Sequence, residues 1–426
     1  MRLFRFFFIK LILRPRQQTY GWAFILLGAL CAPTIVYMWW QSSRPLELFN
    51  VISRSELFEF PHSIDSKSGK SIQIKYTLDP ALHGYAKEIL ERHRPDFGVI
   101  VVMDATNGNL LAIQDYAHNT KDREEFPRLF ARSNFPAASV FKIVTAAAAI
   151  DSAAIHPDFE IGYRGRMHTL YKRNVFFDAR RFRPNNFVSL KEAFGKSINS
   201  FFGRLAVNYL DPITLREYAY RFYFNRSLPF ELPLAASSAF IPKDDGENWG
   251  YVEAASGFTT KNSLSPIHAA TIGSVVVNQG RLRLPRMIAS AYDMNENKAL
   301  VLPDAGLVDV LGAHTADQLS TLMGETIYTG TSRKSFRGFY RDKRFSSVVV
   351  GGKTGSLTGS DPEGKYDWFV GFAKSPDRAI SFSVLTINKE YWQVKSAYLA
   401  RKIIEKYFSE DWLSNNADST SLVKNR

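Results

Sequence analysis

Apolar residues form short β-rich runs in two separate parts of the chain. Residues 98–103 and 110–113 are such runs, and residues 106–109 between them contain an Asn-Gly pair. Asn-Gly between two β-rich runs predicts a hairpin, because both residues tolerate the positive φ angles of a tight turn. A second group of strand-like runs comes late in the chain, at residues 347–350, 368–373 and 379–385.

Helical patterns fill most of the space between these strands. Residues 138–277 have mainly helical spacing of apolar positions, and residues 393–408 have it again near the C-terminus. Early and late strands with helices between them predict one sheet assembled from both ends and covered by helices. We therefore expect an α/β fold of the α+β type, with an antiparallel five-stranded sheet flanked by helices and a helical lobe.

The longest uncharged apolar stretch is near the N-terminus, at residues 21–40. Its length is sufficient for a helix that crosses the hydrocarbon part of a bilayer. Five cations and no acidic residue precede it in residues 1–20, so the positive-inside rule places this segment in the cytoplasm. We expect a transmembrane helix that anchors a periplasmic or extracellular domain in the cytoplasmic membrane. A cleaved signal peptide or a lipoprotein modified at Cys31 is the alternative.

The remaining boundaries follow from composition. Residues 41–71 end in a polar stretch and are expected to be a linker, whereas residues 409–426 are rich in Ser, Asn, Asp and Thr and are expected to be disordered. Residues 72–408 then form the main domain, and the hydrophobic content of 45% is enough for a substantial core. A single cysteine excludes an internal disulfide framework.

The net charge of +13 raises the question of a nucleic-acid partner. Five of the cations belong to the N-terminal segment, and we interpret the others as spread along the chain without a basic run. We expect no nucleic-acid partner, because attraction to anionic lipid explains the N-terminal cations better. The eight histidines lack metal-ligand spacing, so we expect no metal and no cofactor.

The first candidate for chemistry is the pair Ser139 and Lys142, at the predicted start of an alanine-rich helix. Residues three apart share one helix face, so the two side chains should be neighbours. Burial lowers the pKa of a lysine, and a neutral Lys142 could accept the Ser139 proton during nucleophilic attack. The pattern is weak by itself, because Ser421 and Lys424 repeat it near the C-terminus.

The second candidate is Ser197 with Asn199, between two predicted helices. Ser189 and Glu192 form a capping box that starts a helix just upstream, and an apolar helical pattern follows downstream. Both side chains should point into a cleft, where the hydroxyl passes a proton to a leaving amine and the amide binds a substrate peptide bond. A connecting turn with routine capping residues is the alternative.

The third candidate continues the strand predicted at residues 347–350, and it is the most specific of the three. An ammonium group and two hydroxyls are suited to bind a carboxylate, and the strand edge can pair with an extended peptide through backbone hydrogen bonds. The residues are Lys353, Thr354, Gly355 and Ser356.

The three motifs, in this order, resemble the active-site signatures of penicillin-binding transpeptidases and serine β-lactamases. The resemblance to the transpeptidase domain of penicillin-binding proteins covers about residues 74–408. It extends to further stretches of the chain at residues 76–79, 254–257, 265–270, 330–331 and 367–371.

This resemblance implies a membrane-anchored peptidoglycan D,D-transpeptidase that cross-links stem peptides through an acyl-enzyme. Stem peptides are then the substrates, β-lactam antibiotics the inhibitors, and a glycan polymerase or other cell-wall synthesis proteins the candidate partners. The implied oxyanion hole consists of the backbone N–H groups of Ser139 and Ser356. The implied catalytic set is Ser139, Lys142, Ser197 and Asn199, and the substrate-binding set is Lys353, Thr354, Gly355 and Ser356.

Three alternatives share parts of this chemistry. A D,D-carboxypeptidase or a serine β-lactamase uses the same acylation step and then lets water attack, and a β-lactam sensor or an inactive scaffold shares the fold. A class A β-lactamase needs a deacylating glutamate, and the candidate Glu231 lacks the expected sequence context. The proteins that this chain resembles usually carry a glycosyltransferase domain or a long pedestal module before the transpeptidase domain. Only about thirty residues separate Trp40 from Ser71 here, so we expect no glycan polymerisation by this chain.

Overall fold

The computed structural model describes residues 47–66, 69–178, 181, 183–184, 186–243, 248–303 and 305–409. None of the helices in these ranges is both long and apolar enough to span a bilayer. The predicted transmembrane helix at 21–40, its basic flank at 1–20 and residues 410–426 of the predicted tail are outside the described residues. Those three assignments stay predictions.

The centre of the molecule is a five-stranded sheet in the order β13-β14-β15-β3-β4. All its neighbouring strands are antiparallel, so the sheet predicted from both ends of the chain is confirmed. Strand β13 extends well past the apolar run because its polar residues occupy an edge of the sheet, where alternate side chains face solvent. The strands are β3 (Phe97–Asp104), β4 (Leu110–Ala117), β13 (Val349–Ser360), β14 (Glu363–Lys374) and β15 (Ala379–Asn388).

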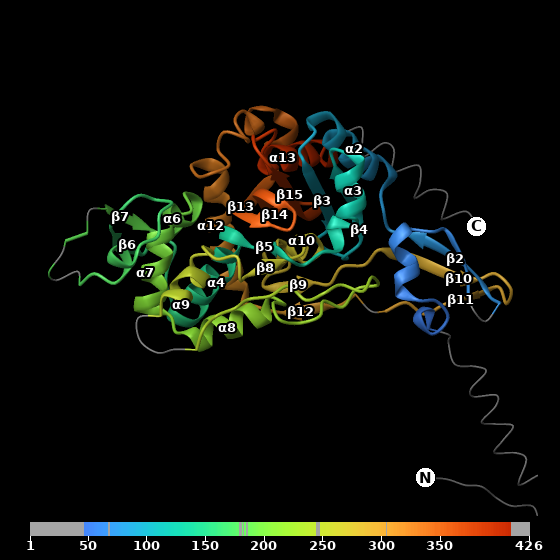
Figure 1. The fold of residues 1–426 in the computed structure, drawn as a ribbon, viewed down its shortest axis with the longest axis horizontal. Helices are drawn as coiled ribbons and strands as arrows, with labels where there is room; N and C mark the ends of the chain where they lie inside the picture. The colour runs from blue at the N-terminus through green and yellow to red at the C-terminus, as the bar shows by residue number, and fades with distance from the viewer. Residues whose placement is uncertain are drawn as a thin grey trace, which may run out of the picture.

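Helices cover both faces of this sheet, as Figure 1 shows. Helices α2 (Pro80–His93) and α13 (Ser396–Tyr407) pack on one face, and α10 (Pro266–Ile272) packs on the other. Strand β3 contributes alternate residues to two hydrophobic clusters, one of which contains Val101 and the other Val102. A strand that is buried on both faces appears in a sequence as a continuous apolar run, which is why it was easily predicted.

The predicted helical lobe lies on one side of the sheet, on the left in Figure 1. Helix α12 connects this lobe with the sheet, because it packs against α6 and against strand β13. The helices of the lobe are α4 (Lys142–Ala153), α5 (Lys172–Val175), α6 (Leu190–Gly195), α7 (Asn199–Tyr209), α8 (Pro212–Arg221) and α9 (Trp249–Ala255), and α12 is Ala313–Tyr328. Two further helices contact the central sheet: α3 (Thr120–Glu125) contacts β4, and α11 (Ser274–Val277) contacts β14 and β15. The lobe also carries the antiparallel pair β6 (Glu160–Tyr163) and β7 (Asn186–Ser189), with α5 between them in the chain.

A second, four-stranded sheet lies on the opposite side of the molecule, on the right in Figure 1. Its order is β1-β2-β10-β11, so strands from before and after the helical lobe meet in it. Its strands are β1 (Ser63–Asp65), β2 (Ser71–Tyr76), β10 (Ile288–Asp293) and β11 (Lys298–Ala299). Two two-stranded pairs complete the described strands: β5 (Phe135–Pro136) with β8 (Ser263–Leu264), and β9 (Arg281–Arg283) with β12 (Leu307–Asp309).

The expectation of a linker at residues 41–71 is corrected for its described part. Leu48 and Leu57 are fully buried in short 3₁₀ helices, and they belong to the same hydrophobic cluster as strand β3. Lys70 forms an ion pair of 2.8 Å with Asp293 of β10. The folded domain therefore includes residues from Glu47 onwards, because these apolar side chains have a core to pack against.

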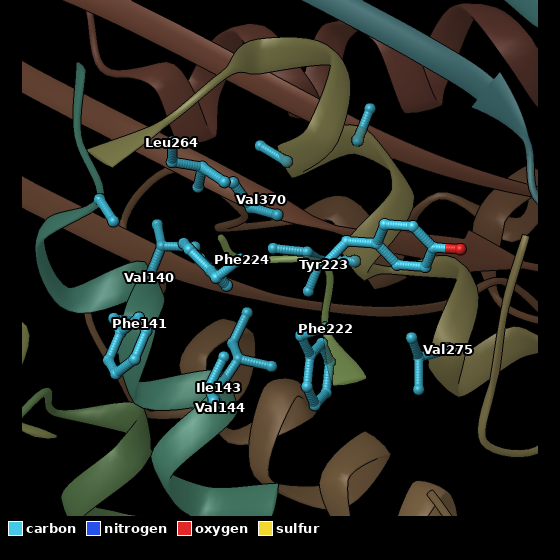
Figure 2. Packing of buried hydrophobic residues seen from close by; sticks show 14 of the residues in the cluster. Val140, Phe141, Ile143, Val144, Phe222, Tyr223, Phe224, Leu264, Val275 and Val370 are labelled. Atoms are coloured by element: carbon cyan, nitrogen blue, oxygen red, sulfur yellow. The ribbon is translucent and has the colours of Figure 1, made fainter. Parts of the chain in front are cut away.

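The apolar residues after Ser139 anchor the start of α4 in this core. Figure 2 shows Val140, Phe141 and Val144 beside Phe224, which comes from the segment after α8. The rings of Phe141 and Phe224 meet edge to face, with centroids 5.3 Å apart. Such packing fixes the backbone of the turn that carries Ser139.

The burial of the N-terminal segment leads to a stability prediction. Leu57→Ala should lower the free energy of unfolding by about 2–5 kcal/mol, because it leaves a cavity in the core. Ser55→Ala, two residues away on an exposed position, should change it by no more than about 0.5 kcal/mol. Urea unfolding followed by tryptophan fluorescence measures both values. Equal midpoints for the two variants would restore the linker interpretation.

Candidate active site

The turn that carries Ser139 has an unusual backbone. Ser139 lies in a short 3₁₀ segment, Ala138–Phe141, that runs directly into α4. Ala138 has a φ of 47°, in the left-handed region that a residue with a side chain rarely adopts. Val140 and Phe141 are buried on the other side of the turn, which leaves Ser139 at the surface of a cavity. The predicted helix start is confirmed, with this 3₁₀ turn as its first part.

The amine of Lys142 connects the first two motifs. Its Nζ lies 2.8 Å from Ser139 Oγ, 2.7 Å from Asn199 Oδ1 and 2.6 Å from the carbonyl oxygen of Ser256. The amide and carbonyl oxygens can only accept hydrogen bonds, so each takes one N–H of the amine. A neutral amine has one lone pair left, and it faces the Ser139 hydroxyl.

The surroundings of Lys142 favour this neutral form. The side chain is fully buried, and loss of hydration lowers the pKa of its ammonium group well below the usual range. The positive charge of Lys353 lowers it further. Burial alone also lowers the pKa of Lys353, to about 7. The predicted role of Lys142 as a base therefore has the geometry and the electrostatics that it requires.

The second motif lies between α6 and α7, as predicted. Ser189 Oγ accepts a hydrogen bond from the N–H of Glu192 and starts α6. Ser197 has a φ of 57°, another left-handed residue, and it lines the cavity together with Asn199. Two residues with side chains in this region, each next to a reactive group, indicate that the fold holds both turns in a strained shape.

Asn199 has a different set of contacts from the one the sequence suggested. Its Oδ1 accepts from Lys142, and its Nδ2 donates to the carbonyl oxygen of His168 at 2.9 Å. The amide therefore positions the lysine first. One N–H of its NH₂ group remains for a substrate peptide bond.

The third motif is on the edge strand β13, as predicted, but its four residues differ in exposure. Thr354 and Ser356 line the cavity, and the hydroxyl oxygens of Thr354 and Thr331 are 2.6 Å apart. Lys353 is fully buried below the cavity wall and donates to the carbonyl oxygen of Thr354 at 3.1 Å. Its charge thus reaches the cavity as an electrostatic field, and the two hydroxyls supply the polar surface.

Two glycines allow the three motifs to come together. Gly355 of β13 packs on the Ser139 turn, where a Cβ would lie 3.2 Å from the carbonyl oxygen of Ala137. Gly257 has a φ of +60°, and a Cβ there would come within 2.1 Å of the carbonyl oxygen of Ala138. Any other residue at position 257 would push the Ser139 turn out of place.

The resulting cavity has a volume of about 410 Å³. It contains Ser139, both residues of the second motif and both hydroxyls of the third, so the structure brings the predicted motifs to one site. Lys142, Lys353 and Gly355 support it from below. The lining residues are Ser139, His168, Ser197, Asn199, Gly257, Phe258, Thr331, Lys334, Ser335, Thr354, Ser356, Asp367, Lys395 and Ala397.

Asp367 is a site residue that was not predicted from the sequence. It pairs with Ser356 across the β13–β14 ladder, and its Oδ1 accepts from Ser356 Oγ at 3.2 Å. Its Oδ2 accepts from the backbone N–H of Ser396 at 2.8 Å, and burial raises the pKa of this carboxyl. The adjacent Trp368 is buried and donates to the carbonyl oxygen of Pro136, so it belongs to the core. Strand register was the signal that could have identified Asp367.

His168 is a second unpredicted residue at the cavity, and no local motif marks it. Burial lowers the pKa of its imidazole, which favours the neutral ring. Glu231 lies elsewhere, where its carboxylate accepts from the backbone N–H groups of Met287 and Ile288. No cluster of three or more His, Cys, Asp or Glu side chains that could bind a metal ion occurs in the part of the chain that the structure describes.

Known proteins resemble this chain at the level of family and fold. The family model of the penicillin binding protein transpeptidase domain matches residues 98–405. A search of curated protein sequences finds no match.

Solved structures with the same fold include an imipenem acyl-enzyme complex of penicillin-binding protein A from M. tuberculosis, which is 20% identical with a TM-score of 0.62 over 80% of each chain. The D,D-transpeptidase domain of a peptidoglycan glycosyltransferase from Eggerthella lenta is 21% identical, with a TM-score of 0.61 over 79% of this chain and 82% of that chain. Penicillin binding protein 3 from M. tuberculosis, in complex with aztreonam, is 17% identical, with a TM-score of 0.63 over 82% of this chain and 80% of that chain.

The pairing of two buried lysines leads to a titration prediction. Lys353→Met should raise the pKa of Lys142, because it removes the like charge that disfavours the ammonium form. Lys395→Met removes a half-exposed charge at the cavity rim and should change the pKa of Lys142 less. NMR titration of isotope-labelled lysine side chains measures the pKa directly. A Lys142 that titrates at the ordinary lysine pKa in the unmutated protein would contradict the assignment.

Proposed function

Because the chain belongs to the penicillin binding protein transpeptidase domain family, we propose that it is a peptidoglycan D,D-transpeptidase that uses Ser139 as its nucleophile. The observation that carries the proposal is the contact of 2.8 Å between Ser139 Oγ and the amine of the fully buried Lys142. Acyl transfer from a serine requires a hydroxyl next to a base that is neutral at the working pH.

Acylation begins when neutral Lys142 takes the proton of Ser139 and the oxygen attacks the carbonyl carbon of the D-Ala-D-Ala bond. The backbone N–H groups of Ser139 and Ser356 stabilise the oxyanion. The C–N bond then breaks, and the departing D-Ala amine receives the proton from Lys142 through the Ser197 hydroxyl. The products are free D-Ala and an ester of the donor peptide on Ser139.

Substrate binding uses the exposed edge of β13. An extended donor peptide adds to this edge through backbone hydrogen bonds. Its terminal carboxylate contacts Thr354 and Ser356, above the buried charge of Lys353. The pKa of Lys353 is about 7 without a ligand, and a bound carboxylate would raise it and keep the lysine charged.

An amine, rather than water, is proposed to resolve the acyl-enzyme. No glutamate lines the cavity within the described residues, and Asp367 is occupied by Ser356 and the N–H of Ser396. A carboxylate that is free to activate water is therefore missing from the described wall of the cavity, which favours transpeptidation over hydrolysis. Attack by an acceptor amine forms the cross-link and regenerates the Ser139 hydroxyl.

Placement at the membrane is part of the same proposal. The uncharged segment 21–40 and the cations before it support an anchor with a cytoplasmic N-terminus and an external catalytic domain. Such an anchor would hold the domain near newly made glycan strands and near a separate glycan polymerase. Nucleic acid has no part in this activity.

The roles of Ser139 and Lys142 are tested by substitution. Ser139→Ala should abolish covalent labelling by fluorescent penicillin, because the attacking oxygen is removed. Lys142→Ala should slow acylation by roughly 100- to 10,000-fold through loss of the general base. Ser421→Ala, in the second Ser-x-x-Lys pattern, is the matched control and should label like wild type. Normal labelling of Ser139→Ala would show that another residue is the nucleophile.

The choice between transfer and hydrolysis is tested with a thioester donor and a D-amino acid acceptor. The ratio of transfer product to hydrolysed donor should rise with acceptor concentration, because the amine and water compete for one acyl-enzyme. A constant ratio with only hydrolysed donor would identify a D,D-carboxypeptidase, and rapid turnover of penicillin itself would identify a β-lactamase. Liquid chromatography with mass detection measures all three products.

A further inference from the structure

A second groove, strongly basic, lies beside the candidate active site. It has a volume of about 620 Å³ and is bordered by Tyr328 at the end of α12. Lys334 lines both this groove and the catalytic cavity, so the two are adjacent. All four of its cationic side chains are exposed: Arg333, Lys334, Arg337 and Arg341.

The acidic side chains close to these cations in the sequence or the fold already have partners. Asp342 binds the guanidinium of Arg344 at 2.7 Å. Glu405 binds Arg401 at 2.6 Å and Lys402 at 2.8 Å. Across the described ranges, no ion pair involves any of the four groove cations. The groove therefore carries positive charge that is not compensated by the protein, which suits a ligand with several anionic groups.

The segment that carries the cations is held firmly in place. Arg401 of α13 donates from its Nη1 to the carbonyl oxygens of Ser335 at 3.1 Å and Arg337 at 2.9 Å. Phe339 stacks on Phe345, with ring centroids 5.0 Å apart, and both rings are buried. These contacts hold the backbone of the segment in place, and its cations are exposed to solvent.

The position of the groove indicates which substrate it serves. It meets the catalytic cavity at Lys334, and the wall of that cavity also contains Thr331 and Thr354, whose hydroxyls are in contact. In the proposed reaction the carboxylate of the departing D-Ala lies against Thr354. The incoming amine must approach the acyl carbon from the side that the departing D-Ala vacates. The rest of the acceptor then extends toward Lys334 and the groove.

We propose that this basic groove binds the acceptor strand, an acidic peptide whose carboxylates follow its nucleophilic amine. This inference rests on the proposed transpeptidase function and adds the acceptor class to it. Guanidinium groups bind carboxylates through paired, charge-assisted hydrogen bonds. The groove has three guanidinium groups, those of Arg333, Arg337 and Arg341. Residues 333–344 are also a basic run in the sequence, so the expectation that the remaining cations are spread without a basic run is wrong here.

The test compares an acidic acceptor peptide with the same peptide amidated at its carboxylates, using the full chain and a thioester donor. Arg337→Glu combined with Arg341→Glu should lower the transfer-to-hydrolysis ratio for the acidic acceptor by about fivefold or more, through repulsion in place of attraction. The ratio for the amidated acceptor and the rate of acylation by penicillin should stay unchanged. The matched control combines Lys75→Glu with Arg281→Glu, which changes net charge equally at exposed positions on β2 and β9.

An unchanged ratio for the acidic acceptor, with normal penicillin acylation, would overturn the groove proposal alone. If penicillin does not acylate the unmutated protein, the proposed function fails and the groove proposal loses its basis.

If the double variant does not fold, a salt titration of the unmutated protein still decides the question. Raising NaCl from about 0.05 M to about 0.5 M should lower the ratio for the acidic acceptor only, because salt screens exposed charges. An equal response of both acceptors would contradict the proposal.

Discussion

One buried amine, Nζ of Lys142, holds the catalytic segments together. It is in contact with Ser139 from the first motif, Asn199 from the second and the carbonyl oxygen of Ser256 at the end of α9. A charged lysine at this depth would lose its hydration and would also face the charge of Lys353. A neutral amine satisfies two acceptors and leaves its lone pair toward the nucleophile. The contact set that stabilises the cleft is therefore also the one that makes Ser139 reactive.

The surrounding fold supplies the rigidity that this arrangement needs. Ala138 and Ser197 both have left-handed backbones, a conformation that costs about 1–3 kcal/mol per residue. Packing around Phe141 and Phe224 offsets this cost on one side of the cleft, and the close contact of Gly257 with Ala138 keeps the Ser139 turn in position. Strain at the reactive residues and dense packing behind them thus belong to one structural unit.

The features that could be predicted from the sequence have strong local patterns. Strand β3 was visible because it is apolar on both faces, and Lys142 was placed next to Ser139 by helical spacing alone. Residues 47–66 were missed because short 3₁₀ segments around Leu48 and Leu57 have no periodicity that reveals burial. Asp367 and His168 reach the cavity through strand register and loop packing, which local patterns do not encode. The depth of Lys353 below the cavity wall likewise depends on tertiary structure, because a strand pattern does not say which face will be covered.

We infer that Ser139, activated by Lys142, forms a stable ester with compounds that imitate D-Ala-D-Ala. Mass spectrometry of the penicillin-treated protein, followed by peptide mapping, tests it most directly. We expect a single adduct with the full mass of penicillin, located on the peptide that contains Ser139 and still present long after free penicillin is removed. An unmodified protein, or an adduct on a different residue, would contradict it.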